Sequence, residues 1–127
     1  MPELPEVETV VNDLRAAGLE GRVLRGVRVR WPRTVAPDTP AQFRRRLHGA
    51  RITLVRRRAK FIVCELSSGE LLLTHLRMTG RLEVVPAAAP HDVHERVIIA
   101  LDDGRELRFH DPRKFGRMHC APRTGNA

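Results

Sequence analysis

Short strand-like runs separated by turn residues fill most of the chain after residue 50, and they limit its fold more than any other feature. Runs of apolar or alternating residues end at clusters of Gly, Ser, Asp and Pro, which is typical of short antiparallel strands. Asp102-Asp103-Gly104 is a good hairpin turn. The expected strands are 23–29, 52–57, 60–66, 70–75, 81–85, 97–101, 106–110 and 117–120. They predict a β-sandwich or barrel with helices packed at one side.

Two helices are expected before most of these strands. Residues 5–17 place apolar side chains at helical spacing, namely Val7, Val10, Val11 and Leu14. Gly18 follows where a helix should stop. The proline-rich segment 31–40 is expected to be a loop. Thr39-Pro40 at its end suits the start of a short helix through Leu47.

The charge balance points to a polyanionic partner. The 127 residues contain 23 Lys or Arg and 15 Asp or Glu, so the formal net charge is +8. Nearly all of the positive charge is Arg, whose planar guanidinium matches phosphate oxygens and guanine edges. Nucleic acid is therefore the first candidate partner. The alternative is a solvated surface encoded by a GC-rich genome, in which Arg replaces Lys.

Composition excludes several other classes of protein. The length suits one domain, and no run of about 18 apolar residues predicts a membrane span. The first residues do not form a signal peptide, so we expect a cytoplasmic protein with no membrane partner. Cys64 and Cys120 are the only cysteines and form no C-x-x-C pair, so we expect two free thiols and no cysteine zinc site.

The residues after Met1 carry a possible nucleophile. Methionine is usually removed before a small residue, which would leave Pro2 with a free secondary amine. Such an amine has a pKa of roughly 8, so a sizeable fraction is unprotonated near neutral pH. Attack on a sugar C1′ or an aldehyde would give an iminium ion, with Glu3 and Glu6 as candidate general acids. The alternative is a plain helix start, in which these residues suit the first turn.

Four segments together resemble the bacterial formamidopyrimidine-DNA glycosylases. Residues 1–9 (MPELPEVET) are similar to the start of that family. Residues 57–61 (RRAKF) resemble its lysine segment, 75–81 (HLRMTGR) its His-Leu-x-Met loop, and 110–116 (HDPRKFG) its Asp-Pro-Arg-x-Phe-Gly loop. The segments occur in the family's order. The resemblance implies a mainly β fold with flanking α: an antiparallel β-sandwich with an N-terminal helix and one further short helix.

The resemblance also implies catalytic roles. Pro2 matches the family's N-terminal proline, which attacks C1′ of a damaged nucleotide as a Schiff-base nucleophile. Glu3 would protonate the sugar ring oxygen and assist base release, with Glu6 in support. Lys60 would contact phosphate and assist catalysis. Without the motif, Lys60 would be interpreted as a strand lysine that keeps its charge in solvent.

A second group of residues matches the family's DNA contacts. The reaction requires the damaged nucleotide to be flipped out of the duplex. Met78 and Phe115 match wedges that replace the lost stacking, and Arg113 matches the group that holds the orphaned base. The alternative for Met78 and Phe115 is ordinary core packing. His75 and Lys114 lie in the same two loops and are expected to contact DNA.

His94 matches a family histidine that contacts DNA. With His91 it could also form a His-x-x-His metal pair, but no third ligand with suitable spacing is evident, so no metal site is expected. Two positions depart from the family's usual residues. Arg77 stands where some members have Gly, and Lys114 stands where many have Arg. Both keep or add positive charge beside the DNA.

Residues 1–120 are therefore expected to form the catalytic β-sandwich domain, with 121–127 as a tail. The family's helix–two-turn–helix domain and its C-terminal finger, which holds one zinc ion, are absent from this sequence, so no cofactor is expected here. The implied partner is double-stranded DNA with oxidised bases or abasic sites. We expect a monomer in the bacterial cytoplasm, associated with the nucleoid, with little or no glycosylase activity from these residues alone.

The implied function is excision of oxidised purines, 8-oxoguanine and formamidopyrimidines, by a bifunctional glycosylase and AP lyase in base excision repair. An endonuclease VIII-like enzyme, which removes oxidised pyrimidines with the same amine, stays open. That branch usually has Gly where Leu4 stands and tends to lack the Arg113 and Phe115 loop. A non-catalytic module that binds damaged DNA also stays open, as does a generic basic β-domain. Neither would need a reactive amine.

Overall fold

A computed structural model describes residues 4–123, which form two α-helices, one 3-10 helix and eight strands. In chain order these are α1 (Leu4–Ala16), β1 (Leu24–Val29), η1 (Pro32–Val35), α2 (Pro40–Leu47), β2 (Ile52–Arg58), β3 (Phe61–Leu66), β4 (Glu70–His75), β5 (Arg81–Pro86), β6 (Glu95–Leu101), β7 (Arg105–His110) and β8 (Arg117–Pro122). The chain is mainly β with flanking helices, as expected.

The strands form two antiparallel four-stranded sheets. One sheet has the order β1-β6-β7-β5 and the other has the order β2-β3-β4-β8. Both sheets turn apolar side chains into one shared core, among them Ile99, Leu107 and Phe109 from the first sheet and Ile62, Leu72 and Met118 from the second. The two sheets stay separate, which confirms the antiparallel sandwich and excludes the barrel.

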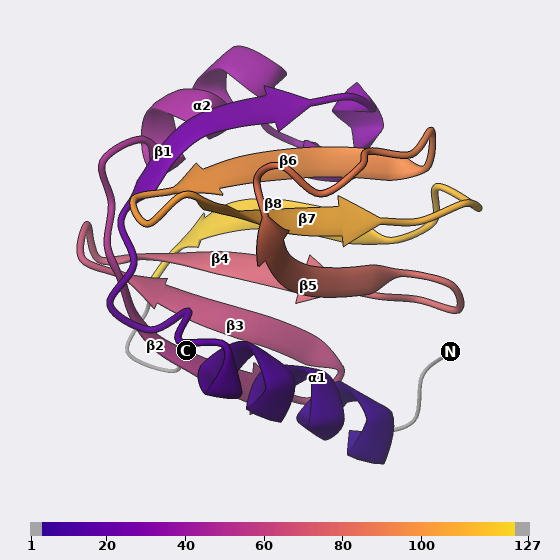
Figure 1. The fold of residues 1–127 in the computed structure, drawn as a ribbon, viewed down its shortest axis with the longest axis horizontal. Helices are drawn as coiled ribbons and strands as arrows, with labels where there is room; N and C mark the ends of the chain where they lie inside the picture. The colour runs from indigo at the N-terminus through magenta and orange to yellow at the C-terminus, as the bar shows by residue number, and fades with distance from the viewer. Residues whose placement is uncertain (1–3, 124–127) are drawn as a thin grey trace.

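The helices close opposite open sides of the sandwich. α1 packs against β2 of one sheet and β5 of the other, with Val7, Val11 and Leu14 buried. α2 and η1 cover β1 and β8, and Phe43 and Leu47 of α2 are buried. Figure 1 shows α1 below the sheets and α2 above them. The expected placement of both helices at one side is therefore wrong, because a sandwich has two open sides and each helix covers one.

Local signals explain how α2 begins. The Thr39 hydroxyl accepts a hydrogen bond from the Gln42 N–H at 3.1 Å, and the Thr39 N–H donates to the Gln42 side chain at 2.9 Å. This is a capping box, and it confirms the helix start expected at Thr39-Pro40. The preceding segment was expected to be only a loop. It contains η1 instead, because Thr34 and Val35 are buried against the sandwich.

The last strand is longer than expected. β8 runs to Pro122, and Ala121 and Pro122 pair with Leu71 and Glu70 of β4. These two residues therefore belong to the sheet, whereas the sequence placed them in the tail. The pairing partner decides where β8 ends, and the sequence of β8 alone does not contain that information. Residues 124–127 of the expected tail lie outside the described residues.

Candidate nucleic-acid interface

Three loops at one end of the sandwich carry most of the predicted site residues. They are the β2–β3 turn, the β4–β5 loop and the β7–β8 loop, at the right of the view in Figure 1. Each loop holds one non-glycine residue with a positive φ: Ala59 at 51°, Arg77 at 56° and Lys114 at 62°. This left-handed conformation costs an L-residue about 1–2 kcal/mol. Such strain persists only where surrounding contacts impose it, and it concentrates at functional sites.

Met78, Arg113 and Phe115 form one cluster at the tips of two of these loops. The Arg113 guanidinium carbon lies 5.0 Å from the centre of the Phe115 ring, and Arg113 Nη1 donates to Met78 Sδ at 3.8 Å. The Met78 side chain is 60% exposed and that of Phe115 is 52% exposed. This exposure excludes the alternative that they are core residues. Large apolar groups held in solvent around a guanidinium suit insertion between bases.

Asp111 organises the β7–β8 loop from beneath. Its carboxylate is fully buried and accepts hydrogen bonds from the Arg113 N–H at 3.1 Å and the Gly116 N–H at 2.7 Å. It also accepts from the Thr79 hydroxyl of the β4–β5 loop. Sequence reasoning quoted Asp111 within a motif but gave it no role. An Asp followed by Pro at a strand end is a signal for such loop capping.

Two glycines allow these loops to pack closely. A Cβ on Gly116 would lie 2.4 Å from Cζ of Phe109, and a Cβ on Gly80 would lie 2.5 Å from the backbone oxygen of Leu76. Both separations are shorter than a Cβ tolerates, so a side chain at either position would force its neighbours to shift. Glycine is therefore required at both positions, one in each loop, and the loop shape depends on them.

Arg117 holds the β7–β8 loop from the opposite side. Its Nη1 donates to the carbonyl oxygens of Lys114, Phe115 and Gly116 at 2.9, 3.1 and 2.8 Å. Burial, together with the positive charges of Arg33 and Arg77, lowers the pKa of Arg117. Sequence reasoning missed this residue, because nothing in its local pattern distinguishes it from the chain's many exposed arginines.

Lys114 lies against an aromatic ring beside this loop. Its Nζ is 3.9 Å from the centre of the Trp31 ring, in cation–π geometry. Trp31 and Lys114 line a shallow pocket together with Arg33, Arg113, Phe115 and Arg117. Cations alternating with aromatic side chains suit the phosphates and bases of a nucleic acid.

His75 lies at the end of β4, directly across from Phe61 of β3. The two rings meet edge to face, with centres 5.1 Å apart. His75 Nδ1 accepts the backbone N–H of Arg77 at 3.1 Å, so the neutral ring carries its proton on Nε2. Burial, and then the charges of Arg77 and Lys60, lower the pKa of His75. The ring therefore offers a neutral N–H donor, which suits an acceptor such as a phosphate oxygen.

The start of α1 is tied to the turn that carries Lys60. The Glu8 carboxylate accepts from Arg57 Nε at 2.7 Å, and Arg57 Nη1 donates to the Ala59 carbonyl at 3.0 Å. Glu6 is exposed in the first turn of α1. Pro2 and Glu3 lie outside the described residues. The residues that directly follow them are nevertheless fixed at the same end of the sandwich as Lys60.

His94 and His91 have different partners. The His94 ring packs edge to face against His110, with centres 5.6 Å apart, and its carbonyl accepts the Asp111 N–H at 2.9 Å. His91 Nδ1 instead lies 2.7 Å from a Glu95 carboxylate oxygen. Among residues 4–123, no three His, Cys, Asp or Glu side chains are grouped so that they could hold a metal ion. The same part of the chain has no helix long and apolar enough to cross a membrane.

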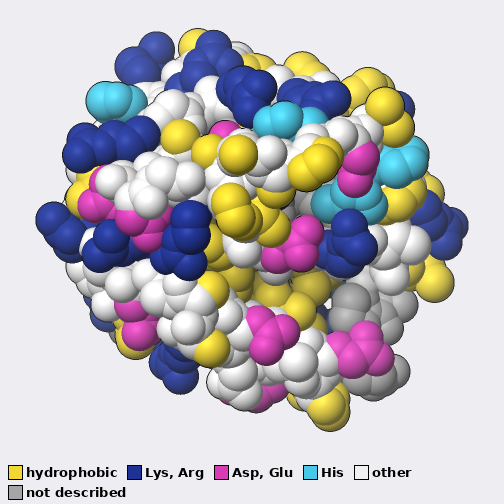
Figure 2. Space-filling model, viewed as in Figure 1, with side chains coloured by type: hydrophobic (Ala, Val, Ile, Leu, Met, Phe, Trp, Pro, Cys, Tyr) yellow, Lys and Arg dark blue, Asp and Glu magenta, His cyan; other side chains and the backbone are white. Residues whose placement is uncertain are grey.

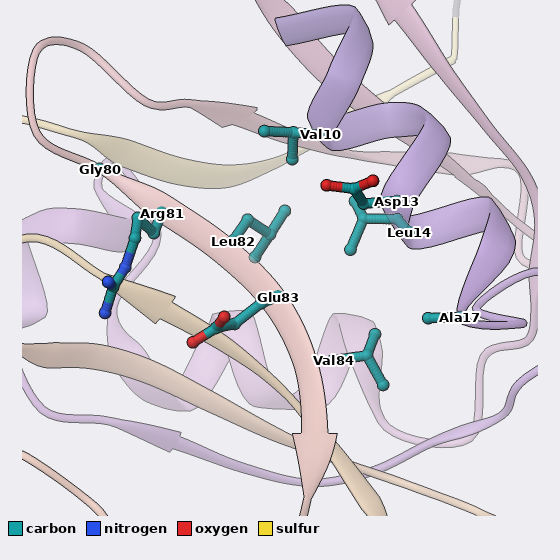
Figure 3. Close-up of a pocket in the computed structure, with 9 residues that line it drawn as sticks. All are labelled: Val10, Asp13, Leu14, Ala17, Gly80, Arg81, Leu82, Glu83 and Val84. Carbon is teal, nitrogen blue, oxygen red and sulfur yellow. The ribbon is translucent and has the colours of Figure 1, made fainter. Parts of the chain in front are cut away.

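The surface elsewhere offers less chemistry. Figure 2 shows basic side chains spread over the face seen in Figure 1, with histidines at its upper left and in its right-hand half. A groove of about 330 Å³ runs between α1 and β5. Val10 and Leu14 face Leu82 across it, while Arg81 points away (Figure 3). None of the predicted catalytic or DNA-binding residues that the structure describes lines this groove, so the loop end remains the candidate site.

Known proteins match the chain over nearly its whole length. A family model described as the formamidopyrimidine-DNA glycosylase N-terminal domain matches residues 1–118. The formamidopyrimidine-DNA glycosylase of Herpetosiphon aurantiacus is 49% identical over 128 residues, which cover 100% of this chain and 46% of that protein. The Bacillus subtilis protein of the same name is 42% identical over 120 residues, which cover 94% of this chain and 43% of that protein.

Solved structures agree. A complex of the Lactococcus lactis protein with DNA containing FAPY-dG has a TM-score of 0.85 at 30% identity and covers 93% of this chain and 43% of that one. A complex with DNA containing an abasic site has a TM-score of 0.87 at 30% identity, over 94% of this chain and 44% of that one. The chain thus spans less than half the length of these relatives. On this evidence it belongs to the family of formamidopyrimidine-DNA glycosylase N-terminal domains.

Proposed function

We propose that this chain supplies the catalytic domain of a bifunctional DNA glycosylase and AP lyase that removes oxidised purines in base excision repair. The observation that carries the proposal is the exposed cluster of Met78, Arg113 and Phe115 at the same end of the sandwich as Lys60 and the start of α1. The substrate class rests on the relatives, which are named for formamidopyrimidine-DNA, with structures that contain FAPY-dG or an abasic site.

The proposed chemistry begins at the amine of Pro2 after Met1 is removed. The nitrogen forms a bond to C1′ of the flipped nucleotide as the bond from C1′ to the base breaks, and the proton lost by the amine balances the one gained by the departing base. Glu3 protonates the sugar ring oxygen, the ring opens, and an iminium ion results. Glu6, exposed in the first turn of α1, supports this acid–base work. The proposal requires no cofactor from this chain.

The other residues hold the DNA in this proposal. Met78 and Phe115 fill the gap left by the flipped nucleotide, and Arg113 donates to the orphaned base. Lys60 contributes a positive charge to the phosphate at the lesion. His75 donates its Nε2–H to the same backbone. Lys114 and His94 contact flanking DNA in the bacterial cytoplasm, where the protein acts as a monomer.

Borohydride trapping on abasic-site DNA tests the proposal. Sodium borohydride reduces the iminium to a stable amine, so the chain with a free Pro2 amine, established by intact mass, forms a covalent adduct. A chain whose amine is blocked by an N-terminal extension forms none, whereas Lys60→Arg retains the adduct. An adduct formed by the chain with the blocked amine would place the nucleophile elsewhere. DNA binding without any adduct would instead indicate a non-catalytic module.

Substrate choice separates the two enzyme functions. Duplexes with 8-oxoguanine opposite cytosine are expected to compete for trapping better than duplexes with an oxidised pyrimidine. The reverse order would favour the endonuclease VIII-like function. Excision of 8-oxoguanine by these 127 residues alone is expected to be slow or undetectable, and robust excision would contradict that expectation.

A further inference from the structure

We propose that Asp111 is a positioning residue that joins the β4–β5 and β7–β8 loops, so that Met78, Arg113 and Phe115 enter DNA as one unit. The role in DNA rests on the proposed function, because it concerns the residues assigned there to gap filling. The joint between the loops is a property of the free chain. It can therefore be tested whether or not the chain acts on DNA.

One carboxylate serves both loops. Oδ1 of Asp111 accepts from the Thr79 hydroxyl and from the Arg113 N–H at 3.1 Å, and Oδ2 accepts from the Gly116 N–H at 2.7 Å. Thr79 follows Met78 directly, and Arg113 and Gly116 flank the loop tip that carries Phe115. The two loops are 35 residues apart in sequence, measured from Met78 to Arg113. The Asp111 carboxylate thus connects, through hydrogen bonds, the loop that carries Met78 with the loop that carries Phe115.

Burial makes this joint stiff. Asp111 is 0% exposed, so its charge depends on these donors in place of water. A buried carboxylate that loses a hydrogen-bond donor also lacks water to replace it, which costs free energy. The arrangement in which Thr79, Arg113 and Gly116 all donate is therefore strongly favoured. The loops therefore hold a single relative position rather than moving independently.

The backbone of Asp111 anchors the joint to the sandwich. Its N–H donates to the His94 carbonyl at 2.9 Å, and its own carbonyl accepts from Arg96 Nε at 2.9 Å. Arg96 is itself buried, in β6. Arg117 completes the assembly by holding the carbonyls of the same loop from the far side. The cluster of Met78, Arg113 and Phe115 is therefore attached to the core through Asp111, so it does not move as a free loop would.

The DNA-free chain gives the decisive test. Thr79→Val removes only the hydroxyl that links the two loops, because Val has the shape of Thr, and Thr79→Ser keeps the hydroxyl. Thr53→Val is the matched control. It removes the hydroxyl of a β2 residue that donates to the Glu65 carbonyl of β3 at 3.2 Å, away from both loops. The amides of Arg113 and Gly116 are expected to exchange hydrogen about tenfold faster in Thr79→Val, with the rates restored in Thr79→Ser and unchanged in Thr53→Val. Equal exchange at both amides in Thr79→Val and the parent chain would overturn the joint.

A double-mutant cycle tests the consequence in DNA. Met78→Ala and Phe115→Ala are combined, in the parent and in the Thr79→Val background, and the rate of trapping on abasic-site DNA is measured. Strong non-additivity in the parent, lost in Thr79→Val, is the expected result. The same non-additivity in both backgrounds would overturn the single-unit role of Asp111. A parent chain that forms no adduct would contradict the proposed function, while the exchange result would still decide the joint.

Discussion

Three residues at the loop end of the sandwich have a strained backbone conformation. Ala59, Arg77 and Lys114 have left-handed backbones, each next to a residue with a proposed contact to DNA. None of these conformations could be predicted from the sequence, because all three residue types favour negative φ. The resemblance gave one hint, since some relatives have Gly at the position of Arg77. The structure supplies the physical reason, which is that glycine adopts this φ without strain.

Ala59→Gly is expected to stabilise the chain by about 0.5–1 kcal/mol, because relief of the left-handed strain exceeds the greater entropy of glycine in the unfolded chain. The midpoint of urea unfolding measures this. Ala100→Gly in β6 is the control and should lower the midpoint, since Ala100 has no such strain to relieve. A decrease of similar size in both variants would show that Ala59 is not strained.

His75 is expected to make stability depend on pH. Its pKa in the folded chain lies below the ordinary value of 6.5, so the unfolded chain binds the proton more readily. Stability is therefore highest above 6.5 and falls as the pH drops toward the folded-state pKa. His119, whose pKa burial also lowers, adds to the same trend.

The measurement compares urea midpoints at about pH 7.5 and about pH 5.5. His75→Gln should reduce the loss on acidification, and an NMR titration of the His75 ring should give a pKa below 6.5. A ring that titrates above 6.5 would contradict both the sign of this effect and the neutral N–H donor proposed for DNA contact.

Among the secondary-structure elements, the sequence predicted the bounds of the strands better than the positions of the helices and loops around them. Alternating and apolar runs bounded by turn residues fixed all eight strands to within a few residues. The side of the sandwich on which each helix packs could not be predicted, because Val7, Val11 and Leu14 show only that α1 has a buried face. The contacts of Met78 and Phe115 with Arg113 come from tertiary packing of the loops, so the resemblance and not the local pattern indicated them. An exposed Met or Phe has the same local pattern as a buried one.

Gly116→Ala is expected to destabilise the chain by about 1–3 kcal/mol, since the new Cβ would overlap the Phe109 ring and force the loop to shift. Gly26→Ala in β1 is the control, because a Cβ there meets no atom within 4 Å. Thermal unfolding of both variants checks the difference. Equal melting temperatures would mean that the β7–β8 loop tolerates a side chain at this position.

For the whole molecule, some charged side chains form ion pairs that stabilise the fold, and the remaining positive charge attracts anions. Several arginines neutralise carboxylates on the body of the sandwich: Arg46 pairs with Asp38 and Glu70, and Arg108 pairs with Glu95 and Glu106. These pairs leave the net charge of +8 unchanged, so the excess cations create the long-range field. The sequence predicted the sign of this field. It did not predict which arginines were paired, because the partners lie on other strands and helices.

DNA binding is expected to weaken steeply with salt, through release of counterions from the phosphates. Lys114→Gln should reduce the slope of log affinity against log salt by about one, as for the loss of one phosphate contact. Arg45→Gln, at an exposed position on α2, should change the slope less. Fluorescence anisotropy across a salt series measures both variants. An equal change in both would indicate non-specific attraction and not a contact at the loop end.

α1, which covers one open side of the sandwich, directly follows Pro2, the residue that carries the proposed nucleophile, and its neighbour Glu3. α1 packs against β2 and β5, and the bond from Glu8 to Arg57 holds its first turns at the turn that carries Lys60. During synthesis, the first residues made therefore wait for strands that emerge much later. Until then the amine proposed as the nucleophile lacks the lysine and the loop residues that the folded sandwich brings near the start of α1. In the proposed function, the amine of Pro2 would therefore become competent for catalysis only after the domain has folded.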